Sequence, residues 1–355
     1  MNKHLLILSM LFGACALPVS QKDVLSSLEP ADAGQAQEVD AGCQESSLTS
    51  WPVKVLFLVD NRGSLCIIDP PGAQAGGSAF CEQFGMSAGV TVPGRVKALE
   101  QFWLANAAQP NVWSAVTWWA PGPRGFSFQP VSSGFPKAAA AELTTQLGKA
   151  MDLQGGLGLV KEQLEADLRA SEPALRARTK YLVVVISSGV PSPMCSANDA
   201  AASYATPANP EGIWADSPAS GTFCNVAPAS ACDPLRGTDS NGQTCIPGFV
   251  AGSDRNQPAA LYQQALDIAA LRATYGAGEI SVHTRLLFDR SKIDACGPIC
   301  QDLLGMPPSD ALSFGTYVLQ RVASAGGGRF VNPGVPQQLD LSDLDTTSLR
   351  PACAP

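Results

Sequence analysis

Unbroken apolar runs mark the strands that the sequence predicts. Residues 53–60 (VKVLFLVD) and 181–186 (YLVVVI) are apolar at almost every position, which is typical of strands buried on both faces of a sheet. Residues 125–131 follow a Pro/Gly turn and could pair antiparallel with the strand before them. The predicted strands are residues 53–60, 112–119, 125–131, 181–186, 280–288 and 329–331.

The predicted strands are separated by segments whose apolar residues recur at helical spacing. In the first of these segments the apolar residues include Val96, Leu99 and Phe102. Alternating strands and helices predict an α/β fold with a doubly wound, mostly parallel central sheet and helices on both faces. Ligands of such sheets bind at the carboxyl ends of the strands. The predicted helices are residues 94–108, 137–149, 154–170, 259–275 and 312–325, with a last helical turn at 339–344.

The alternation is interrupted by an irregular, cysteine-rich insertion at residues 191–256, between the fourth and fifth strands. We expect residues 51–355 to form a single domain that contains this insertion. Residues 16–50 are rich in Ala, Gly, Glu and Asp and have no apolar period. Such a stretch cannot bury enough surface to order itself, which predicts a flexible tether.

Residues 1–15 have the pattern of an export signal. Lys3 is followed by an apolar stretch, and the small residues Gly13 and Ala14 precede Cys15. Small residues directly before a cysteine favour lipidation of Cys15, and ordinary cleavage after Ala16 is the alternative. We expect an outer-membrane or cell-surface lipoprotein that reaches the membrane through its lipid anchor, and otherwise a periplasmic or secreted protein.

The cysteine content agrees with export. The chain has eleven cysteines. If Cys15 carries the lipid, ten remain, and this even number favours disulfides in an oxidising compartment. Chain termini usually lie close together, so cysteines that flank the domain are candidates to pair. The expected pairs are Cys66–Cys81, Cys296–Cys300 and Cys43–Cys353, with Cys195, Cys224, Cys232 and Cys245 paired among themselves in an order that stays open.

Composition narrows the function classes. Of the 355 residues, 45% are hydrophobic and 15% charged, which excludes a disordered chain. The net charge of −8 and the absence of any Lys/Arg cluster argue against a nucleic-acid partner. His4 lies in the export signal, so a Ser-His-Asp hydrolase would have to use His283, and no G-x-S-x-G elbow accompanies it. We therefore expect a protein that is not an enzyme.

The loop after the first strand reads Asp60-Asn61-Arg62-Gly63-Ser64. An apolar strand that ends in D-x-S-x-S opens the von Willebrand factor type A domain, and the sequence resembles this family, in particular bacterial surface lipoproteins that carry such a domain. The resemblance covers residues 53–345 and rests on VKVLFLVDNRGSL, MDLQGGLGLV, YLVVVISSGVPSP, SVHTRLLFD and LQRVASAGGGRFVN, in the family's order. It implies a metal-ion-dependent adhesion site, in which hard oxygens hold Mg²⁺ or Mn²⁺.

The sequence departs from the pattern of this adhesion site. Arg62 occupies the position of the motif's first Ser, whereas Ser64 keeps the second. The family's Thr falls at Met151, with Asp152 next to it, and the family's Asp after the fourth strand falls at Ser188. The oxygen donors that remain in this degenerate site are Asp60, Ser64, Asp152 and Ser188.

Three interpretations of the degenerate site stay open. In the first, Asp60 only turns the loop and Arg62 points to solvent. In the second, the Arg62 guanidinium replaces the metal as a fixed cation beside Asp60, with Asp152 as a further partner. In the third, the remaining oxygens still bind Mg²⁺ or Mn²⁺; the first two need no cofactor.

The resemblance implies a function in adhesion or assembly. We expect a binding module that contacts a protein or surface polymer through the loops at the strand carboxyl ends and the insertion at residues 191–256. The alternative is a structural subunit of an envelope complex whose metal site no longer functions.

Overall fold

The computed structural model describes residues 50–62, 65–70, 81, 92–119, 123–145, 152–191, 194–195, 253–296 and 308–349. All of them belong to one compact unit that spans Thr49–Ala352. The predicted export signal, Cys15, the tether and most of the insertion lie outside the described residues. Among the described helices, none has the length and apolar character needed to cross a membrane.

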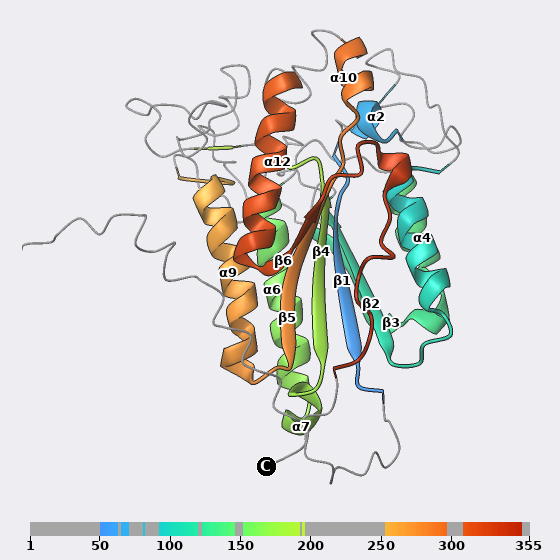
Figure 1. Cartoon of the computed structure of the whole chain (residues 1–355), viewed down its shortest axis with the longest axis vertical. Coiled ribbons are helices and arrows are strands. Elements are labelled where there is room, and N and C mark those ends of the chain that lie inside the picture. Colours follow the sequence, from blue (N-terminus) through green and yellow to red (C-terminus); the bar gives the residue numbers. More distant parts are fainter. Residues whose placement is uncertain are drawn as a thin grey trace, which may run out of the picture. The chain divides into compact units, whose positions relative to one another are not determined.

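Six strands form one sheet in the order β3-β2-β1-β4-β5-β6 (Figure 1). Every neighbouring pair is parallel except β2 and β3, which form the predicted antiparallel pair. This strand order is that of a doubly wound sheet, so the predicted fold class is confirmed. The strands are β1 (Val53–Asp60), β2 (Val112–Trp119), β3 (Pro123–Pro130), β4 (Lys180–Ser187), β5 (Glu279–Leu286) and β6 (Gly327–Val331).

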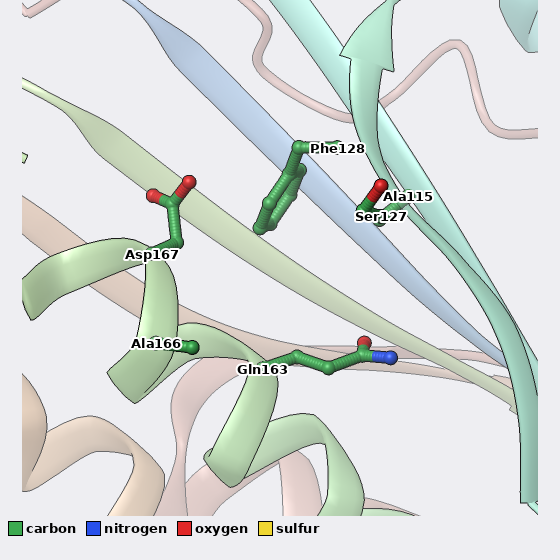
Figure 2. A pocket seen from close by; sticks show the side chains of 6 residues that line it. All are labelled: Ala115, Ser127, Phe128, Gln163, Ala166 and Asp167. Atoms are coloured by element: carbon green, nitrogen blue, oxygen red, sulfur yellow. The ribbon is translucent and has the colours of Figure 1, made fainter. Parts of the chain in front are cut away.

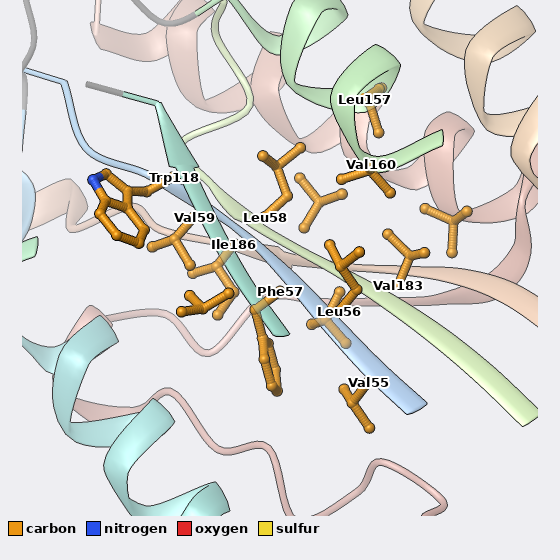
Figure 3. Packing of buried hydrophobic residues seen from close by; sticks show 14 of the residues in the cluster. Val55, Leu56, Phe57, Leu58, Val59, Trp118, Leu157, Val160, Val183 and Ile186 are labelled. Carbon is orange, nitrogen blue, oxygen red and sulfur yellow. The ribbon is translucent and has the colours of Figure 1, made fainter. Parts of the chain in front are cut away.

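The centre of the sheet is buried on both faces. On one face of β1, the ring of Phe57 packs 5.0 Å from Phe102 and 5.7 Å from Trp103, centroid to centroid. On the other face, Leu58 approaches Gly156 so closely that a Cβ added to this glycine would lie 3.1 Å from a Leu58 methyl group. Figure 3 shows the packed side chains of the core. This two-sided burial explains why the run 53–60 is apolar without alternation.

Helices cover both faces, as the alternation predicts (Figure 1). α4 covers the face of Phe57. α6 covers the face of Leu58, and α9 packs between α6 and α12. The helices are α2 (Leu65–Ile68), α4 (Gly94–Asn106), α5 (Lys137–Thr145), α6 (Leu153–Ala170), α7 (Pro173–Arg176), α9 (Pro258–Tyr275), α10 (Arg290–Cys296) and α12 (Pro308–Ala325), with 3₁₀ turns η1 (Val131–Ser133) and η2 (Pro336–Gln338).

The prediction of a last helical turn at residues 339–344 is wrong. The chain forms η2 just before it and then continues without a helix to residue 349. The Asp340 and Asp345 carboxylates each accept a hydrogen bond from a backbone N–H two residues later, a local bond that competes with helix formation. We call residues 339–349 the C-terminal strap.

Two buried cations of the sheet hold the C-terminal strap. Arg285 Nη2 donates to Asp343 Oδ1 at 2.6 Å, and Lys180 Nζ donates to Asp345 Oδ2 at 2.6 Å. Both cations are at least 95% buried, whereas the Asp345 side chain is 62% exposed. The strap therefore neutralises charges that the sheet would otherwise bury alone.

The predicted disulfide between Cys66 and Cys81 is confirmed. It joins α2 to a residue 15 positions later in the sequence. Cys195 is also disulfide-bonded. The remaining pairings stay predictions, because each involves residues outside those that the structure describes: Cys43, Cys224, Cys232, Cys245, Cys300 and Cys353.

Candidate functional site

Asp60 and Ser188 meet at the carboxyl ends of two neighbouring strands. Asp60 is the last residue of β1, and Ser188 follows β4, which pairs with β1. Asp60 Oδ2 accepts hydrogen bonds from the backbone N–H of Ser188 at 3.3 Å and from its hydroxyl at 3.1 Å. Both residues are fully buried. Of the predicted oxygen donors, these two therefore lie in direct contact.

Arg62 lies in the same cluster, and its side chain is only 2% exposed. Its Nη2 donates to Ser188 Oγ at 2.6 Å, its Nε lies 3.7 Å from Asp60 Oδ2, and its backbone N–H donates to Asp60 Oδ1 at 3.1 Å. The interpretation in which Arg62 points to solvent is therefore wrong. Burial of this guanidinium is tolerated because a carboxylate and a hydroxyl surround it.

Close backbone packing fixes the turn that carries Ser188. Gly189 has φ +76°, a conformation that side chains with a Cβ disfavour. A Cβ added to Gly189 would lie 2.5 Å from the Cα of Gly315, in the middle of α12. The turn after β4 thus rests directly on the α12 backbone, which holds the Ser188 hydroxyl against Asp60.

Helix α6 brings Asp152 to the same edge of the sheet. The helix runs antiparallel to β1, because Asp167 near its end contacts Lys54 at the start of β1, and Gly156 near its beginning contacts Leu58. Asp152 precedes Gly156 by about one turn. It therefore lies at the carboxyl edge, where β1 ends at Asp60.

Asp152 pairs with Arg255, a residue that the sequence analysis missed. Asp152 caps α6 by accepting from the backbone N–H of Gly155 at 3.1 Å, and its carboxylate is fully buried. Arg255 Nε donates to Asp152 Oδ1 at 2.9 Å, and Arg255 Nη2 contacts Asp152 Oδ2. This two-point contact is the geometry in which a guanidinium binds a carboxylate most strongly.

Arg255 comes from the end of the insertion, and its backbone is fixed there. Cys195 and Arg255 form an isolated antiparallel bridge with two backbone hydrogen bonds of 3.0 Å. We call residues 194–195 and 253–257 the insertion stem. Arg236 and Arg255 are the two basic side chains of residues 191–256, and this scarcity is the signal that could have identified Arg255.

A second buried ion pair supports the loop after β1. Arg95 and Asp69 are both fully buried, and Arg95 Nη1 donates to Asp69 Oδ2 at 2.8 Å. Arg95 Nη2 donates to Asn61 Oδ1 at 2.8 Å and to the Leu143 carbonyl at 2.7 Å. Arg95 thus ties the residue between Asp60 and Arg62 to α4 and α5, which makes the loop part of the core.

The cluster as it stands does not fit a divalent cation. Across the described ranges, no three His, Cys, Asp or Glu side chains gather as a metal site requires. Asp60 and Asp152 each face a guanidinium, and these fixed positive charges would repel a dication placed beside them. Ser64 and Met151, which complete the motif, lie outside the described residues.

His283 lies in the middle of β5, away from the carboxyl edge. Its Nδ1 accepts from the backbone N–H of Arg329 at 3.2 Å, and its Nε2 lies 3.0 Å from Ser281 Oγ. Burial, followed by the charge of Arg285, lowers the pKa of His283 to about 4. The ring is therefore neutral at pH 7 and fully engaged within the sheet, in agreement with a structural role.

A pocket of about 320 Å³ lies at the other end of α6 (Figure 2). Its Asp167 carboxylate accepts from Lys54 Nζ at 2.7 Å and from the Tyr181 hydroxyl at 2.6 Å. Burial and the hydrogen bond to Asp167 raise the pKa of Tyr181 above its usual range. The charge of Asp167 is thus neutralised inside the protein. The pocket is lined by Ala115, Ser127, Phe128, Gln163, Ala166 and Asp167.

No protein-family model matches the chain, and no curated protein matches it. Solved structures that are similar include three N-terminal domains of the type V pili tip protein Mfa5 from Porphyromonas gingivalis (10% identity, 79% of this chain and 47% of that chain, TM-score 0.38). The PilB minor pilin from Streptococcus sanguinis is 12% identical, with 85% of this chain and 63% of that chain covered and a TM-score of 0.40. This chain thus spans less than two thirds of both.

The vWF domain of Mfa5 taken by itself is 12% identical, with 80% of this chain and 90% of that chain covered and a TM-score of 0.39. The structural neighbours of this chain thus include a von Willebrand factor domain and pilus proteins.

Proposed function

We propose that this chain is a binding module at the cell surface, exported and lipid-anchored at Cys15, which contacts a protein or a surface polymer. The contact face is the carboxyl edge of the sheet together with the insertion at residues 191–256. On this proposal the chain carries out no reaction. A Cys15→Ser variant should move from the membrane fraction to the soluble fraction.

The observation that supports this proposal most is the anchoring of the insertion stem. Arg255 binds the buried Asp152, and Asn256 exchanges two hydrogen bonds with Gln154, at 2.9 Å and 2.7 Å. The described stem residues at both ends of the insertion therefore lie at the edge where ligands of doubly wound sheets bind. A large insertion fixed at this edge is well placed to form a contact surface.

The chemistry of the cluster also favours binding over catalysis. Asp60 accepts hydrogen bonds from Arg62 and Ser188, and Asp152 accepts from Arg255 and Gly155. Both carboxylates are fully buried and engaged by donors of the chain itself, so an outside molecule cannot contact them directly. They instead stabilise the loops that surround them.

The experiment uses the full chain with Cys15→Ser, which removes the lipid anchor, and compares it with the same protein in which residues 197–251 are replaced by a short Gly/Ser linker and Cys195 by Ser. Both proteins are mixed with envelope particles, and the sedimented fraction is measured across protein concentrations. Saturable binding by the full chain and its loss in the deletion variant are expected. A Leu104→Ser variant, which changes a 79% exposed side chain of α4, is the matched control and should bind normally. Equal binding by the deletion variant would refute the proposed contact face.

A structural subunit of an envelope complex is the second candidate. The pairing of both buried carboxylates with arginines favours it, because assembly needs no exchangeable metal. For the same reason, chelation of metals does not separate it from metal-free adhesion. Stoichiometry does: a subunit co-purifies with its partners at a fixed ratio after gentle extraction, whereas an adhesion module purifies alone and binds reversibly.

A further inference from the structure

Two of the acidic residues in the degenerate adhesion site are buried at the carboxyl edge. Asp60 and Asp152 are both 0% exposed. An ionised carboxylate in the interior is costly unless a positive charge and hydrogen bonds accompany it. These two carboxylates therefore need two positive charges, which is the charge that a single Mg²⁺ or Mn²⁺ would bring. Asp69, the third buried aspartate of this edge, is already paired with Arg95.

Arg62 supplies the first of these charges from within the motif itself. Ser188 Oγ accepts from Arg62 Nη2 and donates to Asp60 Oδ2, while the Arg62 backbone N–H donates to Asp60 Oδ1. Guanidinium, hydroxyl and carboxylate thus form a closed ring. The position of the family's first Ser is occupied by a side chain that cannot lose its charge in a protein.

Arg255 supplies the second charge from a distant part of the chain. It lies 103 residues after Asp152 in the sequence, and its guanidinium contacts both oxygens of the Asp152 carboxylate. Its side chain is 18% exposed, so it reaches Asp152 from the surface side. Gln257 Nε2 donates to the Cys195 carbonyl at 2.6 Å, which adds a side-chain hydrogen bond between the two segments of the insertion stem.

We infer that Arg62 and Arg255 together replace the divalent cation, and that Arg255 at the same time locks the insertion stem onto α6. The inference does not rest on the proposed function, because its tests need no partner. It has two consequences. Arg62 and Arg255 occupy the carboxyl edge permanently, so its charge balance does not depend on metal concentration. The attachment of the insertion stem to α6 depends on the charge of Asp152.

The first test follows thermal unfolding in EDTA, Mg²⁺ and Mn²⁺. The wild type should have the same Tm in all three. An Arg62→Ser/Arg255→Gln variant should have a lower Tm in EDTA and regain several degrees in millimolar Mn²⁺, because a cation that binds only the folded state stabilises it. Each single variant should respond less, since one guanidinium remains. Arg290→Gln, which removes an arginine from an exposed pair, is the control and should not respond.

Two results would overturn the replacement. One is a wild type that Mg²⁺ stabilises, with the effect lost in Asp60→Ala. The other is a folded double variant whose Tm Mn²⁺ does not change. If the double variant fails to fold, Asp152→Asn/Arg255→Gln keeps the idea testable. It should recover most of the Tm that Arg255→Gln alone loses, and additive losses would show that the pair is not coupled.

The second test measures hydrogen exchange at the insertion stem. The amides of Cys195 and Arg255 are bonded to each other's carbonyls, so their exchange reports on the stem directly. Arg255→Gln should accelerate exchange of both amides severalfold, whereas Arg290→Gln should leave them unchanged. Unchanged protection in Arg255→Gln would show that the Asp152–Arg255 pair does not hold the stem.

Discussion

The two edges of the sheet use ion pairs in different ways. At the carboxyl edge, Asp60, Asp69 and Asp152 are all 0% exposed. At the amino edge, Lys54 and Asp167 are 15% and 19% exposed, and Lys180 pairs with an Asp345 that is 62% exposed. The carboxylates of the amino-edge pairs keep access to water, whereas Asp60, Asp69 and Asp152 do not, although Arg255, the partner of Asp152, is 18% exposed. The negative charges of these buried carboxylates are therefore neutralised by arginines of the chain itself. Without the arginines, a bound metal ion would have to neutralise them.

The difference between the edges predicts how much stability is lost when one partner of each ion pair is removed. The largest loss is expected for the Arg95–Asp69 pair. Arg95→Met leaves the Asp69 carboxylate buried without a counter-charge, and we expect a loss of about 3–5 kcal/mol in the free energy of unfolding. Urea unfolding measures this loss. In the exposed Arg290–Asp294 pair, Arg290→Met should cost less than about 1 kcal/mol. Similar losses in both variants would remove the basis of the comparison.

Lys54→Met should have a smaller effect at the amino edge. Asp167 keeps its hydrogen bond from the Tyr181 hydroxyl and its access to water, so we expect a loss of about 1–2 kcal/mol. The same urea experiment tests this value. A loss as large as that of Arg95→Met would mean that partial exposure does not relieve the carboxylate, against the distinction between the edges.

The smallest effect is expected for Asp345→Asn in the C-terminal strap, below about 1 kcal/mol at pH 7, because Asp345 is 62% exposed and the asparagine keeps a side-chain oxygen that can accept from the buried Lys180. Hydrogen bonds from Lys180 and Thr347 lower the pKa of Asp345 to about 2. Because the pKa of Asp345 is lower in the folded protein than its unfolded value of 3.8, the ionised carboxylate stabilises the fold at pH values above 3.8. This contribution is lost as the pH falls toward 2. The difference in stability between wild type and variant should therefore shrink over that interval. A difference independent of pH would exclude this linkage.

Much of the fold could be predicted because its signals are local. The apolar runs at residues 53–60 and 112–119 coincide with β1 and β2, since strands buried on both faces must be apolar throughout. The prediction of a helical turn at residues 339–344 failed because Leu339, Leu341 and Leu344 are buried in the core without forming a helix. Contacts with the cations Lys180 and Arg285 decide the path of the C-terminal strap, and these contacts are invisible in the local pattern.

The candidate site could be predicted only in part, for a related reason. Asp60, Arg62 and Ser188 lie next to strand ends, so their positions follow from the order of the strands. The scarcity of basic residues in the insertion could have singled out Arg255 as a candidate, but not its position, because nothing in the sequence shows that the end of the insertion returns to the beginning of α6. The three interpretations of Arg62 differed in where its side chain points, and burial by the surrounding elements decides that orientation.

Titration calorimetry of the wild-type chain with Mn²⁺ tests the central claim most directly. The account states that Arg62 and Arg255 occupy the place of a dication, so no saturable binding is expected at millimolar Mn²⁺, and EDTA treatment should change neither the heats nor the fold. Asp60→Ala serves as the control for binding elsewhere on this acidic chain. Saturable binding of one Mn²⁺ by the wild type that is absent in Asp60→Ala would contradict the account.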